Sequence, residues 1–236
     1  MIDWIKTRDG SCTLRNPTHG ETYHSTAGAW SECKHVFVDP FLEHARLHPR
    51  STWRILDLGF GLGLNWLCVV NSFLVETGLR PVSTQTTCPQ LEIVSIERDA
   101  SILDVQVTRE QLGDFVLSSE ALELLQHHKM YRKVEHPRVR AKLLLGNAMD
   151  LMDSVDRIDK RGKFDVIFHD AFSPQKNPEC WTPDFFKKIA ACSNKGTGVC
   201  HTPLLLTYSV ARSVREALQA AGFEVKKCKG FGGKRE

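Results

Sequence analysis

The stretch that decides the fold is Arg54–Asn65, RILDLGFGLGLN, in which an apolar segment runs into closely spaced glycines. Arg54–Leu58 has the composition of a buried strand, and Leu64–Glu76 repeats its apolar residues at helical intervals. Glycines between a strand and a helix permit a tight turn and let backbone N–H groups approach a ligand. The stretch therefore predicts a ligand site where the first strand meets its helix.

Strand and helix patterns alternate along the rest of the chain. The expected strands are Leu91–Glu97, Lys142–Leu145, Phe164–Asp170, Gly198–Thr202 and Phe223–Lys229, and the expected helices are Ser101–His128, Asn147–Val155, Pro183–Ser193 and Ser209–Ala221. This alternation predicts an α/β fold of Rossmann-like type, with a mostly parallel, doubly wound sheet. Ligands of such sheets bind beyond the carboxyl ends of the strands.

The first fifty residues have a weaker pattern, with turn clusters at Arg8–Gly10 and Asn16–Gly20. We expect residues 1–50 to form a small N-terminal extension, including a hairpin, that packs on a main domain over residues 51–236. Gly78–Gln90 is rich in Pro, Thr and Ser and reads as a loop.

Composition excludes several classes of protein. The chain has 236 residues, with 31 Lys and Arg against 28 Asp and Glu. No apolar run approaches the roughly 18 residues that a membrane helix needs, and the charged N-terminus does not resemble a signal peptide. Eight cysteines include no Cys-x-x-Cys pair, so no metal site is expected. We expect a cytoplasmic protein with reduced thiols.

Basic residues gather toward the C-terminus. After His201 the basic residues are Arg212, Arg215, Lys226, Lys227, Lys229, Lys234 and Arg235, against Glu216, Glu224 and Glu236. Such a terminus suits a phosphate-rich partner, and a solvated tail is the alternative interpretation.

The glycine loop is followed by an acidic residue, Glu97, at the end of the next expected strand. A carboxylate at this position can accept hydrogen bonds from a ribose diol, which indicates a nucleoside cofactor. A dinucleotide site typically reads GxGxxG, whereas GFGLGLN has its third glycine one position early. The chain also has no evident second domain for a hydride acceptor. S-adenosylmethionine is therefore favoured over NAD, and a purely structural turn is the alternative.

A second informative loop follows the strand that ends at Asp170. Asp170 would lie at the carboxyl edge of the sheet, near a sulfonium cofactor, and Phe172 and Trp181 offer flat surfaces on which a base could stack. By strand alternation, His169 is expected to point into the fold. The alternative is that Asp170 caps the loop and Trp181 belongs to the core.

Three segments of the chain carry a family resemblance. GFGLGLN at Gly59–Asn65, DAFSPQKNPECWT at Asp170–Thr182 and KGFGGKRE at Lys229–Glu236 resemble the methyltransferase domain of the MnmC family and its single-domain relatives, MnmD. The resemblance begins at YHSTAGAWSECKHVF, residues 23–37, and continues to the end of the chain.

The resemblance implies a class I methyltransferase that uses S-adenosylmethionine to methylate the amine of 5-aminomethyl-(2-thio)uridine at the wobble position of tRNA. It implies cofactor-binding residues Gly59, Phe60, Gly61, Gly63, Asn65, Glu97, Asn147, Ala148, Asp170 and Tyr23, of which Glu97 would hold the ribose and Asn147 and Ala148 would lie by the adenine. It implies substrate-binding residues Phe172, Lys176, Asn177, Trp181, Lys234 and Arg235, with the basic ones at phosphates. Asp170 would be the catalytic residue, as acceptor and possible general base for the amine or chiefly to orient it.

Two departures from the family pattern matter. Family members commonly carry Asp where this chain has Asn147, which puts a carboxylate contact to the adenine in doubt. We expect no FAD-dependent oxidase activity from the segments up to GFGGKRE, and we expect a separate enzyme or pathway to supply the aminomethyl group. The alternatives are a methyltransferase for a small-molecule or protein amine, and a non-catalytic nucleoside- or RNA-binding module.

Overall fold

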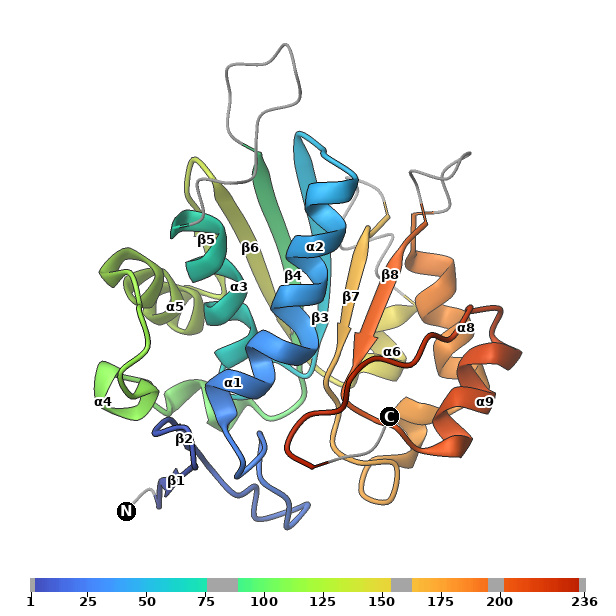
Figure 1. The fold of residues 1–236 in the computed structure, drawn as a ribbon, viewed down its shortest axis with the longest axis horizontal. Helices are drawn as coiled ribbons and strands as arrows, with labels where there is room; N and C mark the ends of the chain where they lie inside the picture. Colours follow the sequence, from blue (N-terminus) through green and yellow to red (C-terminus); the bar gives the residue numbers. More distant parts are fainter. Residues whose placement is uncertain (1–2, 76–88, 154–162, 195–201, 234–236) are drawn as a thin grey trace.

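The centre of the molecule is a six-stranded sheet in the order β5-β6-β4-β3-β7-β8 (Figure 1). The structure is a computed structural model that describes residues 3–75, 89–153, 163–194 and 202–233. The strands are β3 (Thr52–Leu58), β4 (Gln90–Glu97), β5 (Lys133–Glu135), β6 (Val139–Leu145), β7 (Val166–His169) and β8 (Leu204–Thr207), with a separate hairpin of β1 (Ile5–Lys6) and β2 (Cys12–Thr13). All pairs in the sheet are parallel except β5 with β6.

The order of the strands places the ligand crevice. β3 is the first strand of the sheet along the chain and lies between β4 and β7. Successive strands are added on the β4 side and then on the β7 side, so the order reverses beside β3. Doubly wound sheets bind ligands at such a reversal, outside the carboxyl ends of the strands. The observed topology confirms the predicted α/β class.

Helices cover both faces of the sheet (Figure 1). One face carries α1 (Ala29–Cys33), a π-helical turn over Lys34–Val38, α2 (Asp39–Leu47), α3 (Leu64–Val75) and α5 (Ser119–Tyr131), and the other carries α6 (Ala148–Met152), α8 (Pro183–Cys192) and α9 (Arg212–Ala220). Ile55 and Leu56 are adjacent in β3 and belong to the two different cores. Because side chains alternate along a strand, the apolar run of β3 buries both faces.

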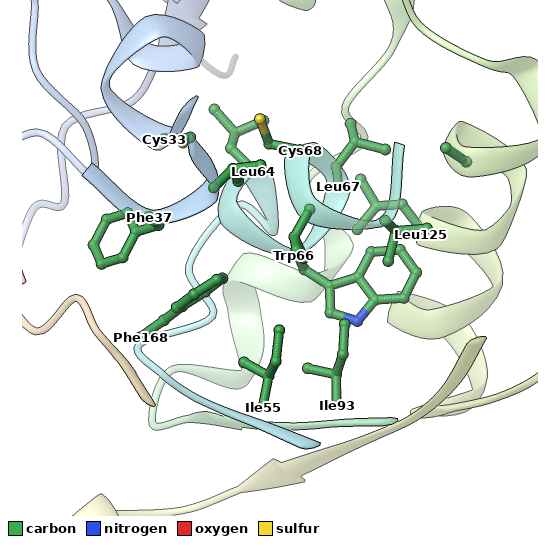
Figure 2. Packing of buried hydrophobic residues seen from close by; sticks show 14 of the residues in the cluster. Cys33, Phe37, Ile55, Leu64, Trp66, Leu67, Cys68, Ile93, Leu125 and Phe168 are labelled. Atoms are coloured by element: carbon green, nitrogen blue, oxygen red, sulfur yellow. The ribbon is translucent and has the colours of Figure 1, made fainter. Parts of the chain in front are cut away.

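Figure 2 shows how the first core is built around α3. Trp66 and Leu67 of this helix lie above Ile55 and Ile93 of the sheet. Phe37, from the N-terminal fifty residues, packs into the same cluster and is 1% exposed. The N-terminal segment therefore contributes to the core of the sheet, and the division of the chain at residue 50 stays a prediction.

Several element predictions are confirmed, with bounds shifted by a few residues. The strands at 54–58, 91–97, 142–145 and 164–170 and the helices that start near 64, 147, 183 and 209 correspond to β3, β4, β6, β7, α3, α6, α8 and α9. His169 points into the fold as predicted, is fully buried, and its Nε2 lies 2.9 Å from the Cys180 carbonyl oxygen.

Two element predictions are wrong. The helix expected over Ser101–His128 is divided into a 3₁₀ turn at Ala100–Asp104, α4 (Arg109–Leu112) and α5, because a capping box at Thr108 and a glycine with φ of 72° at Gly113 interrupt it. The strand expected over Gly198–Thr202 falls mainly outside the described residues and stays a prediction; β8 (Leu204–Thr207) follows it.

The second wrong prediction is the final strand, expected over Phe223–Lys229. This segment forms no ladder, although Phe223 and Val225 pack on the second core. A segment with alternating apolar residues forms a strand only when it pairs with a neighbouring strand. Here the apolar side chains pack on the core, but the segment pairs with no strand of the described residues.

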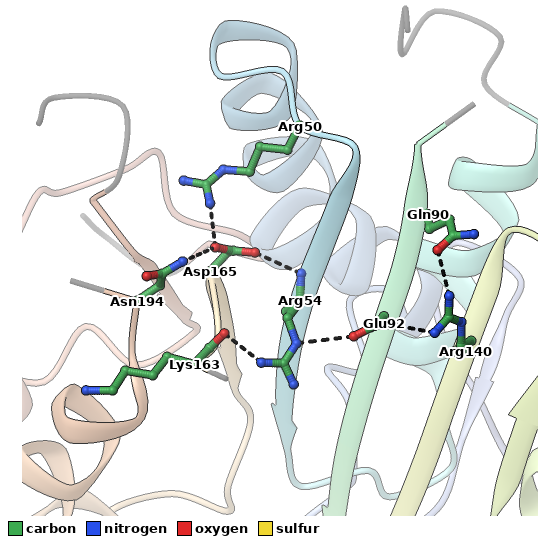
Figure 3. Close-up of polar contacts among 8 residues, drawn as sticks. All are labelled: Arg50, Arg54, Gln90, Glu92, Arg140, Lys163, Asp165 and Asn194. Atoms are coloured by element: carbon green, nitrogen blue, oxygen red, sulfur yellow. Dashed lines mark hydrogen bonds and ion pairs between the residues drawn. The ribbon is translucent and has the colours of Figure 1, made fainter. Parts of the chain in front are cut away.

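A row of charged side chains crosses the amino-terminal edge of the sheet (Figure 3). Arg54, Glu92 and Arg140 are register partners on β3, β4 and β6. Glu92 accepts from Arg54 at 3.2 Å and pairs with Arg140 at 3.3 Å. Asp165 accepts from Arg50 at 2.6 Å and from the Arg54 backbone N–H at 3.0 Å. This network, which we call the paired edge, ties β3, β4 and β6 to the residue before β7, away from the crevice.

Within the described ranges, no helix has both the length and the apolar composition needed to cross a membrane. The same part of the chain gathers no group of three or more His, Cys, Asp or Glu side chains suited to a metal ion.

Candidate active site

The glycine loop and the Asp170 loop leave the sheet side by side. Leu58 and His169 are register partners at the ends of β3 and β7. Gly59 follows with a φ of 90°, and a Cβ there would lie 2.5 Å from the Asp170 carbonyl oxygen. Real Cβ atoms do not approach an oxygen so closely, so only glycine lets the two loops meet. The sequence RILDLG thus places backbone, rather than side chain, beside Asp170.

Glu97 closes the neighbouring side of the crevice, at the end of β4. Its Oε2 accepts from the Gly61 backbone N–H at 2.7 Å, and its Oε1 accepts from the Asp99 backbone N–H at 2.8 Å. The side chain is almost buried, and burial raises the pKa of Glu97 above its ordinary value despite these hydrogen bonds. Glu97 therefore fixes the glycine loop from the edge of the crevice.

Asp170 lies where several segments converge. Its Oδ2 accepts from Asn65 Nδ2, at the start of α3, at 2.6 Å. His24 Nδ1 lies 4.0 Å from the same oxygen, and burial lowers the pKa of His24 to about 4. Tyr208, beyond β8, donates to the Ala171 carbonyl oxygen at 2.9 Å. At neutral pH, Asp170 is thus faced by a neutral imidazole and a side-chain amide.

A cavity of about 980 Å³ joins these groups. It is lined by Gly59, Phe60, Gly61, Glu97, Asn147, Ala148, Asp170, Phe172, Asn177 and Tyr23, all of which were predicted as site residues. Ligand pockets of this size accept a molecule as large as a nucleoside cofactor together with part of a second reactant. The structure therefore brings these ten residues to one place.

The N-terminal segment forms the opposite wall of the cavity, from Arg15 to Thr26. Glu21 accepts from the Ser173 backbone N–H at 3.0 Å and from its hydroxyl at 2.5 Å, which ties this wall to the Asp170 loop. Phe172 lies between two rings, with the His19 centroid at 4.4 Å and the Tyr23 centroid at 5.3 Å. The wall thus encloses the apolar part of the site.

Asn147 has a local structural task besides lining the cavity. Its Oδ1 accepts from the Met149 backbone N–H at 2.9 Å and caps α6. Asn and Asp serve equally well at an N-cap, so the departure from the family pattern preserves the helix start.

Other predicted site residues lie away from the cavity. A Cβ at Gly63 would lie 2.7 Å from both Leu125 and Phe60, so this glycine permits packing between α3 and α5. Trp181 is 5% exposed, and its Nε1 donates to the Phe172 carbonyl oxygen at 2.7 Å, which braces the loop from within the core. Lys176 is exposed on the same loop.

Asn65 reaches the site through its bond to Asp170 and does not line the cavity. Lys234 and Arg235 lie outside the described residues.

Residue-by-residue interpretation of the sequence missed His19, Glu21, His24 and Tyr208, which line the cavity. His24 stands in the YHS segment that belongs to the family resemblance, and this was the available signal. The others follow from tertiary contacts that no local pattern encodes.

Comparison with known proteins agrees with this geometry. Residues 114–236, more than half of the chain, match a family model described as S-adenosyl-L-methionine-dependent methyltransferase. A crystal structure of MNMC2 from Aquifex aeolicus is 34% identical, with a TM-score of 0.72, and the match covers 100% of this chain and 68% of that one.

Curated relatives are named tRNA 5-methylaminomethyl-2-thiouridine biosynthesis bifunctional protein MnmC. The one from Ectopseudomonas mendocina is 32% identical over 93% of this chain, and the one from Burkholderia thailandensis is 28% identical over 94%. The match covers 32% of each relative, so the chain spans about a third of their length. By its family match, its resemblance to the Aquifex structure and its fold, the chain belongs to the S-adenosyl-L-methionine-dependent methyltransferase family that includes the methyltransferase part of MnmC.

Proposed function

We propose that this chain transfers a methyl group from S-adenosylmethionine to the amine of 5-aminomethyl-(2-thio)uridine at the wobble position of tRNA, in the cytoplasm. The observation that carries the proposal is the Asp170 carboxylate, which lies in one cavity with the glycine loop and Phe172. A carboxylate beside an apolar ring suits a reactant with a cationic amine on a flat base.

The residues of the crevice fit the cofactor. The Gly59–Gly61 loop lines the cavity with backbone, because a Cβ at Gly59 would clash with the Asp170 carbonyl oxygen, and such a backbone surface suits the methionine end. Glu97 carries a carboxylate at a strand end, where a ribose diol could donate to it. Asn147 and Ala148 line the cavity beyond Glu97, which suits the adenine. When bound, S-adenosylmethionine supplies a methyl group that its positive sulfur has already activated.

The substrate amine must lose a proton before it can react, because an ammonium has no lone pair. We propose that Asp170 accepts a hydrogen bond from this amine, orients it and receives its proton, which then passes to solvent. The amine nitrogen then forms the new N–C bond as the S–CH₃ bond breaks, and the electron pair of that bond stays on sulfur. The enzyme contributes alignment and a nearby proton acceptor.

Recognition of the base and of the tRNA backbone would use separate features. Leaving the anticodon stack costs a few kcal/mol, and stacking on an aromatic ring such as Phe172 returns about 1–3 kcal/mol per base. Exposed Lys226, Lys227 and Lys229 precede the end of the chain, and the Lys229 carbonyl oxygen lies 2.7 Å from His35 Nε2. This contact joins the basic segment to the π-helical turn at Lys34–Val38.

The described residues form a methyltransferase fold, and methyl transfer does not create the aminomethyl group. That group must therefore come from another enzyme or from a further part of a larger protein. The reaction that supplies this substrate must leave a primary amine on the side chain of the modified base.

The test is transfer of labelled methyl groups from S-adenosylmethionine to tRNA that carries 5-aminomethyl-(2-thio)uridine, followed by nucleoside analysis. We expect the label in 5-methylaminomethyl-(2-thio)uridine, and none when the same tRNA has an unmodified wobble uridine. Label on other nucleosides, or on small amines and peptides in preference to tRNA, would contradict the proposal and favour a different amine substrate.

A further inference from the structure

Two aromatic rings meet face to face at the wall of the cavity. The His19 ring, from the N-terminal wall, lies nearly parallel to the Phe172 ring, with centroids 4.4 Å apart and planes inclined by 29°. Both side chains are half-buried and line the cavity that also contains Asp170. The proposed reaction uses Phe172 as a stacking surface, but it assigns no task to the histidine that covers this ring. The stacked geometry shows that the covered face of Phe172 accepts a flat ring.

The Phe172 ring is the fixed member of this pair. Its backbone carbonyl oxygen accepts a hydrogen bond from Trp181 Nε1 at 2.7 Å. The next residue, Ser173, donates to Glu21 from its backbone N–H and from its hydroxyl. Tyr23 packs against the Phe172 ring at a tilt of 55°, with centroids 5.3 Å apart. Phe172 is therefore held by backbone bonds on both sides and by a second ring.

The turn that carries His19 is held by its backbone, and the imidazole extends from it onto Phe172. Asn16 is 3% exposed, and its Oδ1 accepts from the backbone N–H groups of Thr18 and His19, both at 2.9 Å. Its Nδ2 donates to the Tyr23 hydroxyl at 2.8 Å. Two single bonds join the imidazole to this turn, and rotation about them moves the ring off Phe172 without disturbing the backbone. His19 is therefore the movable member of the pair.

We propose that His19 and Phe172 form a clamp that takes the flipped wobble base between their rings. The inference rests on the proposed function for the identity of that base. Opening the pair gives up one contact between rings and closing it on a base forms two, so entry of a flat base is favoured. The Cα atoms of Phe172 and Asp170, two residues apart, lie within about 7 Å of each other, so a base held on Phe172 can present its side-chain amine to the carboxylate.

A clamp of this kind selects the class of amine that reacts. A base has a π-face on each side and can stack on both rings at once. An aliphatic amine, such as a polyamine or a lysine side chain, has no flat surface with which to part the two rings. The clamp thus adds specificity to a site in which a carboxylate alone would accept any ammonium group.

Substitutions of His19 separate stacking on a base from simple packing. We expect His19→Ala and His19→Leu to raise the KM for tRNA about tenfold, because the base loses one of its two stacking partners. His19→Phe supplies a flat ring, and its KM should stay within about threefold of the wild type. In all three variants kcat at saturating tRNA and the affinity for S-adenosylmethionine should change less than about threefold, because the clamp binds the base and takes no part in the chemistry.

The matched control is His127→Ala. His127 is exposed on α5 and does not line the cavity, and its ring packs on Tyr131 with centroids 4.6 Å apart. The substitution removes a similar pair of rings and should leave the KM for tRNA unchanged. An unchanged or lower KM in His19→Ala would overturn the inference, since a lower value would mean that His19 blocks Phe172. Equal KM values for His19→Phe and His19→Leu would overturn it as well.

A binding experiment keeps the clamp separate from the reaction. The probe is an anticodon stem-loop RNA with 5-aminomethyluridine at the wobble position, added to the whole chain together with S-adenosylhomocysteine. The ring C–H NMR signals of His19, identified by their absence in His19→Phe, should shift because the base replaces Phe172 as the neighbour of the imidazole. The signals of His127 should stay in place, and spermidine, an aliphatic polyamine, should shift neither set.

The binding and kinetic results distinguish failure of the clamp from failure of the proposed function. If the RNA shifts the His19 signals but receives no methyl group from the wild-type protein, the proposed function fails and the clamp stands. If methyl transfer occurs and the His19 signals stay in place, the clamp is overturned and the proposed function stands. An equal shift with spermidine would also overturn the clamp, because it would show no preference for a flat base.

Discussion

The two edges of the central sheet hold their carboxylates in different ways. At the paired edge, Asp165 and Glu92 face arginine side chains, at 2.6 Å from Arg50 and 3.2 Å from Arg54. Figure 3 shows these partners in a continuous row across the strands. An adjacent arginine compensates the negative charge of each of these carboxylates, so the paired edge contributes to the stability of the fold.

At the opposite edge, which we call the carboxyl edge, neutral groups hold the acids. Glu97 accepts from two backbone N–H groups, Asp57 accepts from the Ser95 hydroxyl at 2.8 Å, and Asp170 accepts from the Asn65 amide. Neutral donors orient a carboxylate without compensating its charge. Burial of acids held in this way is costly, and the cost indicates a site prepared for a polar or cationic ligand.

The largest effect should follow removal of the carboxylate at the centre of the carboxyl edge. Asp170→Ala should lower the rate of methyl transfer by about 10²–10⁴, the range for loss of an acid–base group, while S-adenosylmethionine affinity stays within a few fold. Transfer of labelled methyl to tRNA and calorimetric titration of the cofactor measure the two quantities. Asp114→Ala, at an exposed carboxylate between α4 and α5, is the control. Near-normal turnover in Asp170→Ala would remove this residue from the reaction.

Substitutions at the paired edge should lower the free energy of unfolding and leave the affinity for the cofactor unchanged. Asp165→Ala removes the buried carboxylate that pairs with Arg50, and breaking a buried pair costs about 3–5 kcal/mol. Urea unfolding should show this loss, with cofactor affinity preserved at temperatures where the variant is folded. Asp184→Ala breaks an exposed pair with Lys187 and should cost at most about 1 kcal/mol. Equal losses in the two variants would contradict the distinction between buried and exposed pairs.

Titration of Asp57 should be visible as a pH dependence of stability. Burial raises the pKa of Asp57 to about 7, and the Ser95 hydroxyl offsets part of that effect. The unfolded chain has the ordinary value near 3.9, so the folded state binds the proton more tightly. The resulting stabilisation is complete below about pH 4 and is lost as the pH rises through about 7.

Asp57→Asn removes this dependence. We would measure the free energy of unfolding of both proteins in urea between pH 5 and pH 8. The value for the wild type should fall relative to that of the variant as the pH rises. Parallel curves would mean that Asp57 is ionised throughout this range in the folded protein.

The contrast between the edges also separates what the sequence predicts from what it does not. β3, β4 and β7 were predictable because their apolar runs are continuous, and Glu97 and Asp170 follow as strand-end residues that share an edge. The helical character of residues 29–47 was not predictable from local patterns, since it includes a π-helical turn at Lys34–Val38 and is stabilised by packing on α3. The meeting of His24 with Asp170 is tertiary in the same sense.

The two aromatic residues predicted to stack on a base differ in their burial. Phe172 and Trp181 stand in one loop and look equivalent as stacking surfaces in the sequence. In the structure Phe172 lines the cavity, whereas Trp181 packs against His169 with ring centroids 4.4 Å apart. The 3₁₀ turn at Pro178–Trp181 turns the indole inward, and no sequence spacing distinguishes a turn that does so from one that does not.

The smallest expected effect concerns charge outside the carboxyl edge. Lys176 is exposed on the Asp170 loop, and a phosphate contact there would release about one counterion on tRNA binding. Lys176→Ala should weaken tRNA binding a few fold at low salt and reduce the slope of log affinity against log salt by about 0.7–0.9. Filter binding over a salt series measures that slope, and Lys133→Ala on the exposed edge strand β5 is the matched control. An unchanged slope in Lys176→Ala would assign the phosphate contacts to other basic residues, because a lysine that neutralises a phosphate cannot be removed without changing the number of counterions released.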